Sequence, residues 1–163
     1  MKTLKRRRKE HKTNYGRRLK LLKSEKPRVI FRRTNKYIIA QYVKSKEAKD
    51  KVVWGINSKD LLKYGWPESK SGSLKSITAA YLIGYLIGKQ IASKKLVNPI
   101  VDSGMVRTLH KTKVFAFLKG LKDAGVKIKC KDETFPSDDR IKGEHLKDKI
   151  PFEEIKSKIG NLK

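Results

Sequence analysis

The chain has 163 residues, of which 42 are Lys or Arg and 16 are Asp or Glu, for a formal net charge of +26 at pH 7. This length suits one domain with a sizeable core, and the charge predicts a polyanionic partner, with RNA as the first hypothesis. A single Cys and the lack of a CxxC pair exclude a disulfide framework and zinc-site spacing. No apolar leader or bilayer-length span is evident, so we expect a cytoplasmic protein with no membrane partner.

The positive charge is concentrated at the amino end. The first 36 residues hold 16 basic residues against 2 acidic ones, whereas residues 130–163 hold 8 of each. The like charges of Lys5–Lys9 repel one another, so we expect the first dozen residues to form a free arm that becomes ordered on its partner. The near-neutral C-terminal segment is expected to clamp the domain itself or a protein partner.

A short basic helix is expected after the arm, over residues 13–23. Its apolar residues recur at helical spacing, Thr13 or Asn14 can cap its start, and Pro27 prevents its continuation. The expected docking stripe consists of Tyr15, Leu19 and Leu22.

Three β-rich runs follow, over residues 28–33, 37–43 and 51–57, with a polar connector at 44–50. Their short connectors predict antiparallel neighbours. The second run has apolar residues on both faces. The sheet is therefore covered on both sides, or covered on one side and used for binding on the other.

A connector rich in Gly, Pro and Ser at 58–73 leads to a buried helix at 74–93. Its small residues at i, i+4 spacing, Ala80, Gly84 and Gly88, permit close packing on the sheet. The same spacing occurs in membrane-helix dimers, which a chain of this charge disfavours.

The remaining core elements are expected to be a buried strand at 96–102, a helix at 114–124 and a possible last strand at 126–129. The order βββαβα(β) predicts an α/β fold with a mixed sheet of ribonuclease H-like topology and helices packed on it. We expect a basic arm and helix at 1–26, an RNA-binding core at 27–130 and a helical C-terminal extension at 131–163, with Ser137 as a helix cap.

The same element order raises the alternative of a ribonuclease H-like enzyme. Two-metal hydrolysis needs several converging carboxylates, but the core acids Asp102 and Asp123 are isolated in the sequence, and Asp102 suits a turn at a strand end. Cys130 has no neighbouring His to form a catalytic pair. We therefore expect no enzymatic activity, metal site or cofactor.

Three further segments carry binding features. The turn at 32–37 combines cations, an amide and an aromatic ring, and is either an RNA contact or a solvated hairpin tip. The connector places Trp66 among lysines, where the ring either stacks on bases or covers the core edge. The basic residues at 107–113 precede a helix start and form either a phosphate site or a plain loop.

Several segments together resemble one protein family. They are RRRKEHKTNYGRRLKLLKSEKPRVIFRRTNKYIIAQYV, then KYGWPESKSGS running into AAYLIGYLIG, then VFAFLKGLKDAG, and finally FPSDDRIKGEHL. In their order and spacing they resemble the archaeal type of large-subunit ribosomal protein eighteen, a family related to eukaryotic ribosomal protein five.

The resemblance implies a component of the 50S subunit that binds 5S ribosomal RNA and helps to anchor it in the central protuberance. Its implied partners are 5S rRNA, 23S rRNA, the other 5S-binding protein and neighbouring central-protuberance proteins. It also implies an α/β core with a basic extension and no enzymatic activity. The candidate RNA-binding residues are Lys5, Arg6, Arg7, Arg8, Lys9, His11, Lys12, Thr13, Tyr15, Arg17, Arg18, Lys20, Arg28, Arg32, Arg33, Thr34, Asn35, Lys36, Tyr37, Lys63, Trp66, Lys70, Arg107, His110, Lys113 and Arg140.

Overall fold

A mixed four-stranded sheet forms the centre of the molecule. The computed structural model describes residues 3–146 and 148–161; the remaining residues of the expected arm and C-terminal extension lie outside this range. The strand order is β3-β2-β1-β4, with β1 antiparallel to β2, β2 antiparallel to β3, and β1 parallel to β4. The strands are β1 (Arg28–Arg33), β2 (Ile38–Lys46), β3 (Lys49–Asn57) and β4 (Ile100–Asp102).

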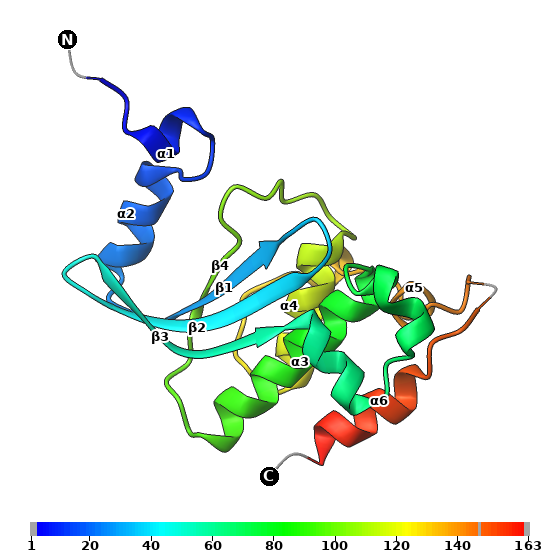
Figure 1. The fold of residues 1–163 in the computed structure, drawn as a ribbon. Coiled ribbons are helices and arrows are strands. Elements are labelled where there is room, and N and C mark those ends of the chain that lie inside the picture. The colour runs from blue at the N-terminus through cyan, green and yellow to red at the C-terminus, as the bar shows by residue number, and fades with distance from the viewer. Residues whose placement is uncertain (1–2, 147, 162–163) are drawn as a thin grey trace.

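Helices pack against one face of this sheet (Figure 1). They are α3 (Ile77–Ser93) and α4 (Lys113–Asp123). The N-terminal helices α1 (Arg6–Lys9) and α2 (Tyr15–Lys23) lie beside the far end of the β2–β3 hairpin (Figure 1). The expected α/β fold with a mixed sheet and packed helices is confirmed.

The β2–β3 hairpin is longer than its sequence indicates. Its strands run through the segment expected to be a connector and meet at Glu47 and Ala48, whose φ angles are +49° and +62°. Two left-handed residues in a two-residue hairpin loop match a type I′ turn, which usually carries Asn-Gly. Because that signal is missing here, the sequence did not reveal the turn.

The fourth strand is shorter than expected, and the fifth is absent from the described chain. Only Ile100–Asp102 pairs with β1, whereas Val97 is exposed. The segment 126–129, expected as a strand, is irregular. The Asn98 side chain accepts from the Lys127 N–H and donates to the Lys127 carbonyl, each at 3.0 Å. The Asn98 side chain thus takes the place of a strand partner for Lys127 alone, and residues 126–129 do not pair with β4.

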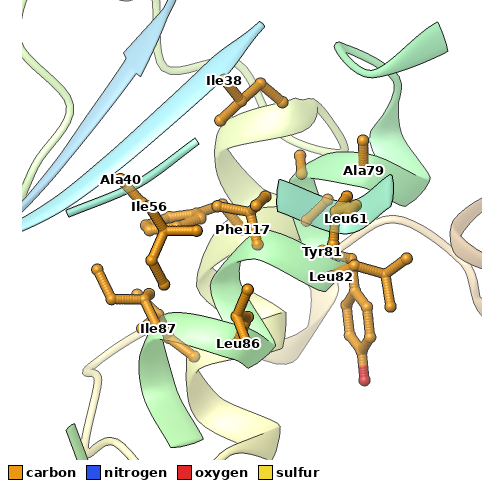
Figure 2. Packing of buried hydrophobic residues seen from close by; sticks show 14 of the residues in the cluster. Ile38, Ala40, Ile56, Leu61, Ala79, Tyr81, Leu82, Leu86, Ile87 and Phe117 are labelled. Atoms are coloured by element: carbon orange, nitrogen blue, oxygen red, sulfur yellow. The ribbon is translucent and has the colours of Figure 1, made fainter. Parts of the chain in front are cut away.

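The core lies between the sheet and the two long helices. Figure 2 shows Ile38, Ala40 and Ile56 of the sheet on the side that faces Phe117 and Ile87 of the helices, and all five are buried. This burial of apolar area is the main favourable term for the fold.

The small residues of α3 pack against α4 rather than against the sheet. A Cβ atom added at Gly84 would lie 2.2 Å from the carbonyl oxygen of Phe117, and one added at Gly120 would lie 2.2 Å from that of Tyr81. Glycines on both helices therefore allow the two backbones to approach. The prediction of close packing is confirmed, but its expected partner was wrong.

The connector and the C-terminal segment are largely helical. Two 3₁₀ helices, η1 (Ser58–Tyr64) and η2 (Glu68–Ser73), fill the connector, and η3 (Asp132–Thr134), α5 (Asp138–Lys142) and α6 (Phe152–Gly160) follow α4. The apolar residues Phe152, Ile155 and Ile159 of α6 are buried in the core cluster. The C-terminal segment thus clamps the domain itself. Ser137 precedes α5 but makes no side-chain capping hydrogen bond.

Candidate nucleic-acid interface

The N-terminal segment has more structure than the expected free arm. One helical turn, α1, occupies the basic run, and Arg6 Nε donates to Glu10 Oε1 at 2.9 Å across i, i+4. Arg7 Nε donates to Thr13 Oγ1 at 2.9 Å. No residue of α1 is buried. The segment therefore holds its cations on the surface, where they can meet phosphates.

The next helix, α2, begins as its sequence predicts. The Asn14 side chain accepts a hydrogen bond from the Arg17 N–H at 3.0 Å, which makes Asn14 the N-cap. The expected docking stripe is wrong in part, because Leu19 is 56% exposed. The other two expected residues, Tyr15 and Leu22, are half-buried, and Leu21 is half-buried as well. Apolar contact alone does not hold α2 in place.

Two arginines attach α2 to the core. Arg17 donates to Ser103 Oγ at 3.0 Å and to the Gly104 carbonyl at 3.1 Å, in the turn after β4. Arg18 donates to Asp50 Oδ2 at 2.9 Å and to the Ala48 carbonyl at 3.1 Å, in the β2–β3 hairpin. Both guanidinium groups therefore position the basic helix, and part of their donor capacity is already used within the fold.

Arg28 is part of the fold and not of the binding surface. Its side chain is 1% exposed and donates to Asp102 Oδ2 at 3.0 Å, to Asp50 Oδ1 at 2.8 Å and to Ser45 Oγ at 3.0 Å. Two carboxylates neutralise its charge away from water. The prediction that Arg28 contacts RNA is corrected by this burial.

Trp66 is also removed from the candidate surface. The residue is 2% exposed, and its Nε1 donates to the Lys70 carbonyl at 3.1 Å. The ring covers the core, which decides between the two alternatives left open by the sequence. Lys63 stays exposed, and Lys70 Nζ donates to the Lys149 carbonyl at 2.9 Å.

Asp102 is a turn residue and the acceptor in an arginine cluster. Its Oδ1 accepts from the Gly104 N–H at 2.8 Å, as expected for a strand-end turn. Its Oδ2 lies 3.4 Å from Arg32 Nη2, besides the contact with Arg28. The other core acid, Asp123, accepts from Tyr81 Oη at 2.7 Å. Both carboxylates therefore serve as hydrogen-bond acceptors within the fold, Asp102 in the arginine cluster and Asp123 for Tyr81.

A hollow that we call the sheet cavity lies between α2 and the sheet face left open by the long helices. Its volume is about 480 Å³, and its lining includes Tyr15 and Arg17 of α2, Ile30 and Gln41 of the sheet, and Met105. The acids that line it, Asp50 and Asp102, are paired with arginines. Its walls can therefore accept an anion without strong repulsion.

The turn between β1 and β2 presents cations to solvent. The Thr34 hydroxyl accepts from the Tyr37 N–H and donates to the Tyr37 carbonyl, both at 2.9 Å, which closes the turn. Arg33 and Lys36 are exposed, whereas Tyr37 is half-buried against the core. The tyrosine supports the turn, and the cations next to it are available for phosphates.

A second hollow, which we call the α4 cavity, lies at the start of α4. Its volume is about 670 Å³. Its basic lining residues are Lys12, Arg32, Arg33, Arg107, Lys111, Lys113 and Arg140, and no acidic residue of the described chain lines it. The cavity shares Lys12, Arg32 and Met105 with the sheet cavity. The two hollows are therefore neighbours along one basic surface.

The structure sorts the candidate residues by exposure. Those that remain exposed are Lys5, Arg6, Arg7, Arg8, Lys9, His11, Lys12, Arg17, Lys20, Arg33, Thr34, Asn35, Lys36, Lys63, Arg107, His110 and Arg140. Those that are half-buried are Thr13, Tyr15, Arg18, Arg32, Tyr37, Lys70 and Lys113.

Sequence reasoning missed several residues of this surface. Lys75 is a cation beside the α4 cavity, and its place in a lysine-rich segment gave only a weak signal. Met105 and Leu109 are exposed apolar residues on the wall of the cavity. Asp50 gave no signal, because only the packing of α2 on the hairpin brings Arg18 to it.

Comparison with known proteins assigns the chain to a family. A family model described as "Ribosomal large subunit proteins 60S L5, and 50S L18" matches residues 1–101. The "Large ribosomal subunit protein uL18" of Korarchaeum cryptofilum is 44% identical over 141 residues, which cover 86% of this chain and 70% of that protein. The proteins of the same name from Aeropyrum pernix and Methanosphaera stadtmanae are 39% and 41% identical, over 86% of this chain and 64% and 70% of their own lengths. The chain belongs to this family of ribosomal large-subunit proteins.

Proposed function

We infer that the chain is a structural, non-enzymatic protein of the large (50S) subunit of the cytoplasmic ribosome. We further infer that it binds 5S rRNA, helps to anchor it in the central protuberance and contacts 23S rRNA. The observation that carries this inference is family membership at 39–44% identity. The continuous basic surface of the arm, the β1–β2 turn and the α4 cavity supports RNA as the partner.

The geometry supports a division of labour between body and arm. Arg17 and Arg18 join α2 to two separate turns of the core, so the basic helix has a fixed direction relative to the sheet. The body then presents phosphate-binding turns in a fixed arrangement, and the exposed cations of α1 extend that surface along the RNA. Such contacts set position and affinity, whereas base contacts set specificity.

The finer organisation of the chain is also part of this inference. The sheet order 3-2-1-4, with β4 parallel to β1, supports a relationship to the ribonuclease H-like topology. The division into a basic segment (1–26), a core (27–130) and an extension (131–163) is supported by the helices that flank the sheet. The exposed side of the extension faces the other 5S-binding protein or its central-protuberance neighbours.

A binding experiment tests the 5S rRNA partner. The full chain is titrated with a 5S rRNA transcript in a filter-binding assay, with a transfer RNA of similar charge density as the control. We expect tighter binding to 5S rRNA than to the control at equal salt. Failure to bind the 5S transcript at low ionic strength overturns the inference.

A further inference from the structure

The α4 cavity holds a set of cations that the fold does not use. Five of them, Arg33, Arg107, Lys111, Lys113 and Arg140, make no side-chain hydrogen bond or ion pair within residues 3–146 and 148–161. They come from three separate parts of the chain: the end of β1, the segment before and at the start of α4, and α5. Unpaired cations that converge from distant segments around one hollow are typical of an anion site.

Holding these cations together opposes folding. Burial lowers the pKa of the Lys113 ammonium, and the nearby charges of Arg33 and Lys75 lower it further. The charges near Lys113 thus come from Arg33 at the end of β1 and from Lys75, just before the Ser76 N-cap of α3. A bound phosphate would relieve this repulsion. Among the described residues, no carboxylate forms an ion pair with Lys113 that would do so.

The cavity also has an apolar wall, which a phosphate alone does not need. Met105 is 48% exposed and Leu109 is 51% exposed, although both are large apolar residues. Phe31, Val106 and Ile77 line the same hollow. A cavity of about 670 Å³ lies within the range of small-molecule sites, roughly 300–1,000 Å³. Its size and mixed lining suit a base together with its phosphate.

The wall beside the cavity is held in a fixed shape. Lys111 has a φ of +57°, which is uncommon for a residue with a side chain. Its N–H donates to the Thr134 carbonyl at 2.8 Å. The Thr112 hydroxyl donates to the Leu109 carbonyl at 2.7 Å, and its oxygen makes no capping hydrogen bond to α4. These bonds fix the loop that carries Leu109 before any ligand binds.

We propose that the α4 cavity binds one unpaired nucleotide of ribosomal RNA, with its phosphate against Arg33, Lys113 and Arg140 and its base against Met105 and Leu109. RNA-binding proteins commonly stack splayed-out bases on aromatic rings or Arg guanidinium planes, and pockets for an extruded base also use apolar side chains. The site would recognise one unstacked position of the RNA, in contrast to the phosphate contacts of the arm. This proposal rests on the proposed function, because it takes RNA as the partner.

The first test needs no ribosomal RNA. The full chain, labelled at methyl groups and lysine side chains, is titrated in NMR experiments with each of the four nucleoside monophosphates and, separately, with inorganic phosphate. We expect every monophosphate that binds to shift the Met105 and Leu109 methyl signals and to raise the pKa of Lys113. Inorganic phosphate should raise the pKa of Lys113 and leave the methyl signals in place. If none of the four monophosphates moves the methyl signals, the proposal is overturned.

The second test uses RNA and a matched control. Leu109→Ser removes an exposed apolar side chain from the cavity, and Val97→Ser removes one of similar exposure (62%) elsewhere. Each variant is assayed for binding to 5S and 23S rRNA transcripts. We expect Leu109→Ser to lower the affinity for one transcript by about three- to tenfold, because apolar contact with the base is lost, and Val97→Ser to leave both unchanged. Equal affinities of the two variants, with wild-type binding intact, overturn the cavity proposal alone. If the wild-type chain fails to bind 5S rRNA, the proposed 5S partner fails, and the monophosphate titration still decides the cavity.

Discussion

Arg28 and Asp102 form a buried ion pair between the parallel strands β1 and β4, with Nη1 3.0 Å from Oδ2. The two residues are 74 positions apart in the chain. Asp50, from the β2–β3 hairpin, joins the pair at 2.8 Å from Arg28 Nη2, and Arg18 of α2 contacts Asp50 from the other side. This arginine and aspartate cluster therefore links the sheet, the hairpin and the N-terminal helix.

Removal of one partner from this cluster should destabilise the protein. Asp102→Ala leaves the buried Arg28 charge with Asp50 as its remaining carboxylate, and it also removes the acceptor of the Gly104 N–H. We expect the free energy of unfolding to fall by about 3 kcal/mol, as measured by urea denaturation. The control is Asp138→Ala, which removes an exposed pair with Lys119 and should cost less than about 1 kcal/mol. Similar effects of the two variants would contradict the structural role of the buried pair.

The attachment of α2 should weaken in acid. Burial alone would raise the pKa of Asp50, but hydrogen bonds from Arg18 and Ser45 and the charge of Arg28 outweigh burial and lower it below the ordinary value of 3.8. A carboxyl group whose pKa is lower in the folded state stabilises the protein above its unfolded-state pKa. That contribution is lost as the pH falls from 3.8 through the folded-state value.

Asp50→Asn tests this pH dependence. We expect the variant to lose less stability than the wild type between about pH 6 and about pH 2, when urea unfolding is measured at each pH. Glu133→Gln, which changes an exposed carboxylate outside the ion pairs of the described chain, should keep the wild-type profile. Parallel profiles for Asp50→Asn and the wild type would show that Asp50 does not carry this effect.

The contact between α3 and α4 should not tolerate an added methyl group. Gly84→Ala places a Cβ atom 2.2 Å from the Phe117 carbonyl oxygen, so the helices must separate. We expect a loss of about 3 kcal/mol in the free energy of unfolding, at the upper end for overpacking. Gly72→Ala, whose Cβ atom would have no neighbour within 4 Å, should change it by less than about 0.5 kcal/mol. Thermal and urea unfolding of the two variants make the comparison.

The cations of the β1–β2 turn should contribute to RNA affinity without supporting the fold. Arg33 and Lys36 are exposed, whereas the neighbouring Arg32 donates to the Asp102 carbonyl at 2.9 Å and is partly structural. The informative variant is therefore Arg33→Ala with Lys36→Ala. We expect it to lower 5S rRNA affinity by about tenfold while the circular dichroism spectrum stays unchanged.

The salt dependence gives a second measure of the same contacts. If the wild type neutralises roughly eight phosphates, log K should fall with log salt at a slope of about −6 to −7, and the double variant should have a slope shallower by about 1 to 2. Lys127→Ala with Lys129→Ala makes the same change in net charge at two exposed residues beyond the C-terminal end of α4. Both variants are measured by filter binding at several salt concentrations, and the control should keep the wild-type slope. If the slope of the control were as shallow as that of the double variant, the effect would come from net charge alone and not from contacts of the turn.

The sequence by itself determined the features that depend on neighbours along the chain. The basic run, the Asn14 cap of α2, the first three strands and the two long helices follow from charge, capping chemistry and apolar spacing. It also gave enough ordered motifs to indicate the family. These are local patterns, so they do not depend on how distant segments of the chain pack.

Only the tertiary structure decided which cations are free to bind. Arg28 and Arg33 begin and end the same strand, yet Arg28 is buried against two carboxylates and Arg33 lies exposed at the α4 cavity. Trp66 turned inward, and the glycines of α3 met α4 instead of the sheet. Spacing along the chain fixes the face on which a side chain lies. The partner on that face is set by how distant segments pack, because burial and charge pairing join residues that the sequence keeps far apart.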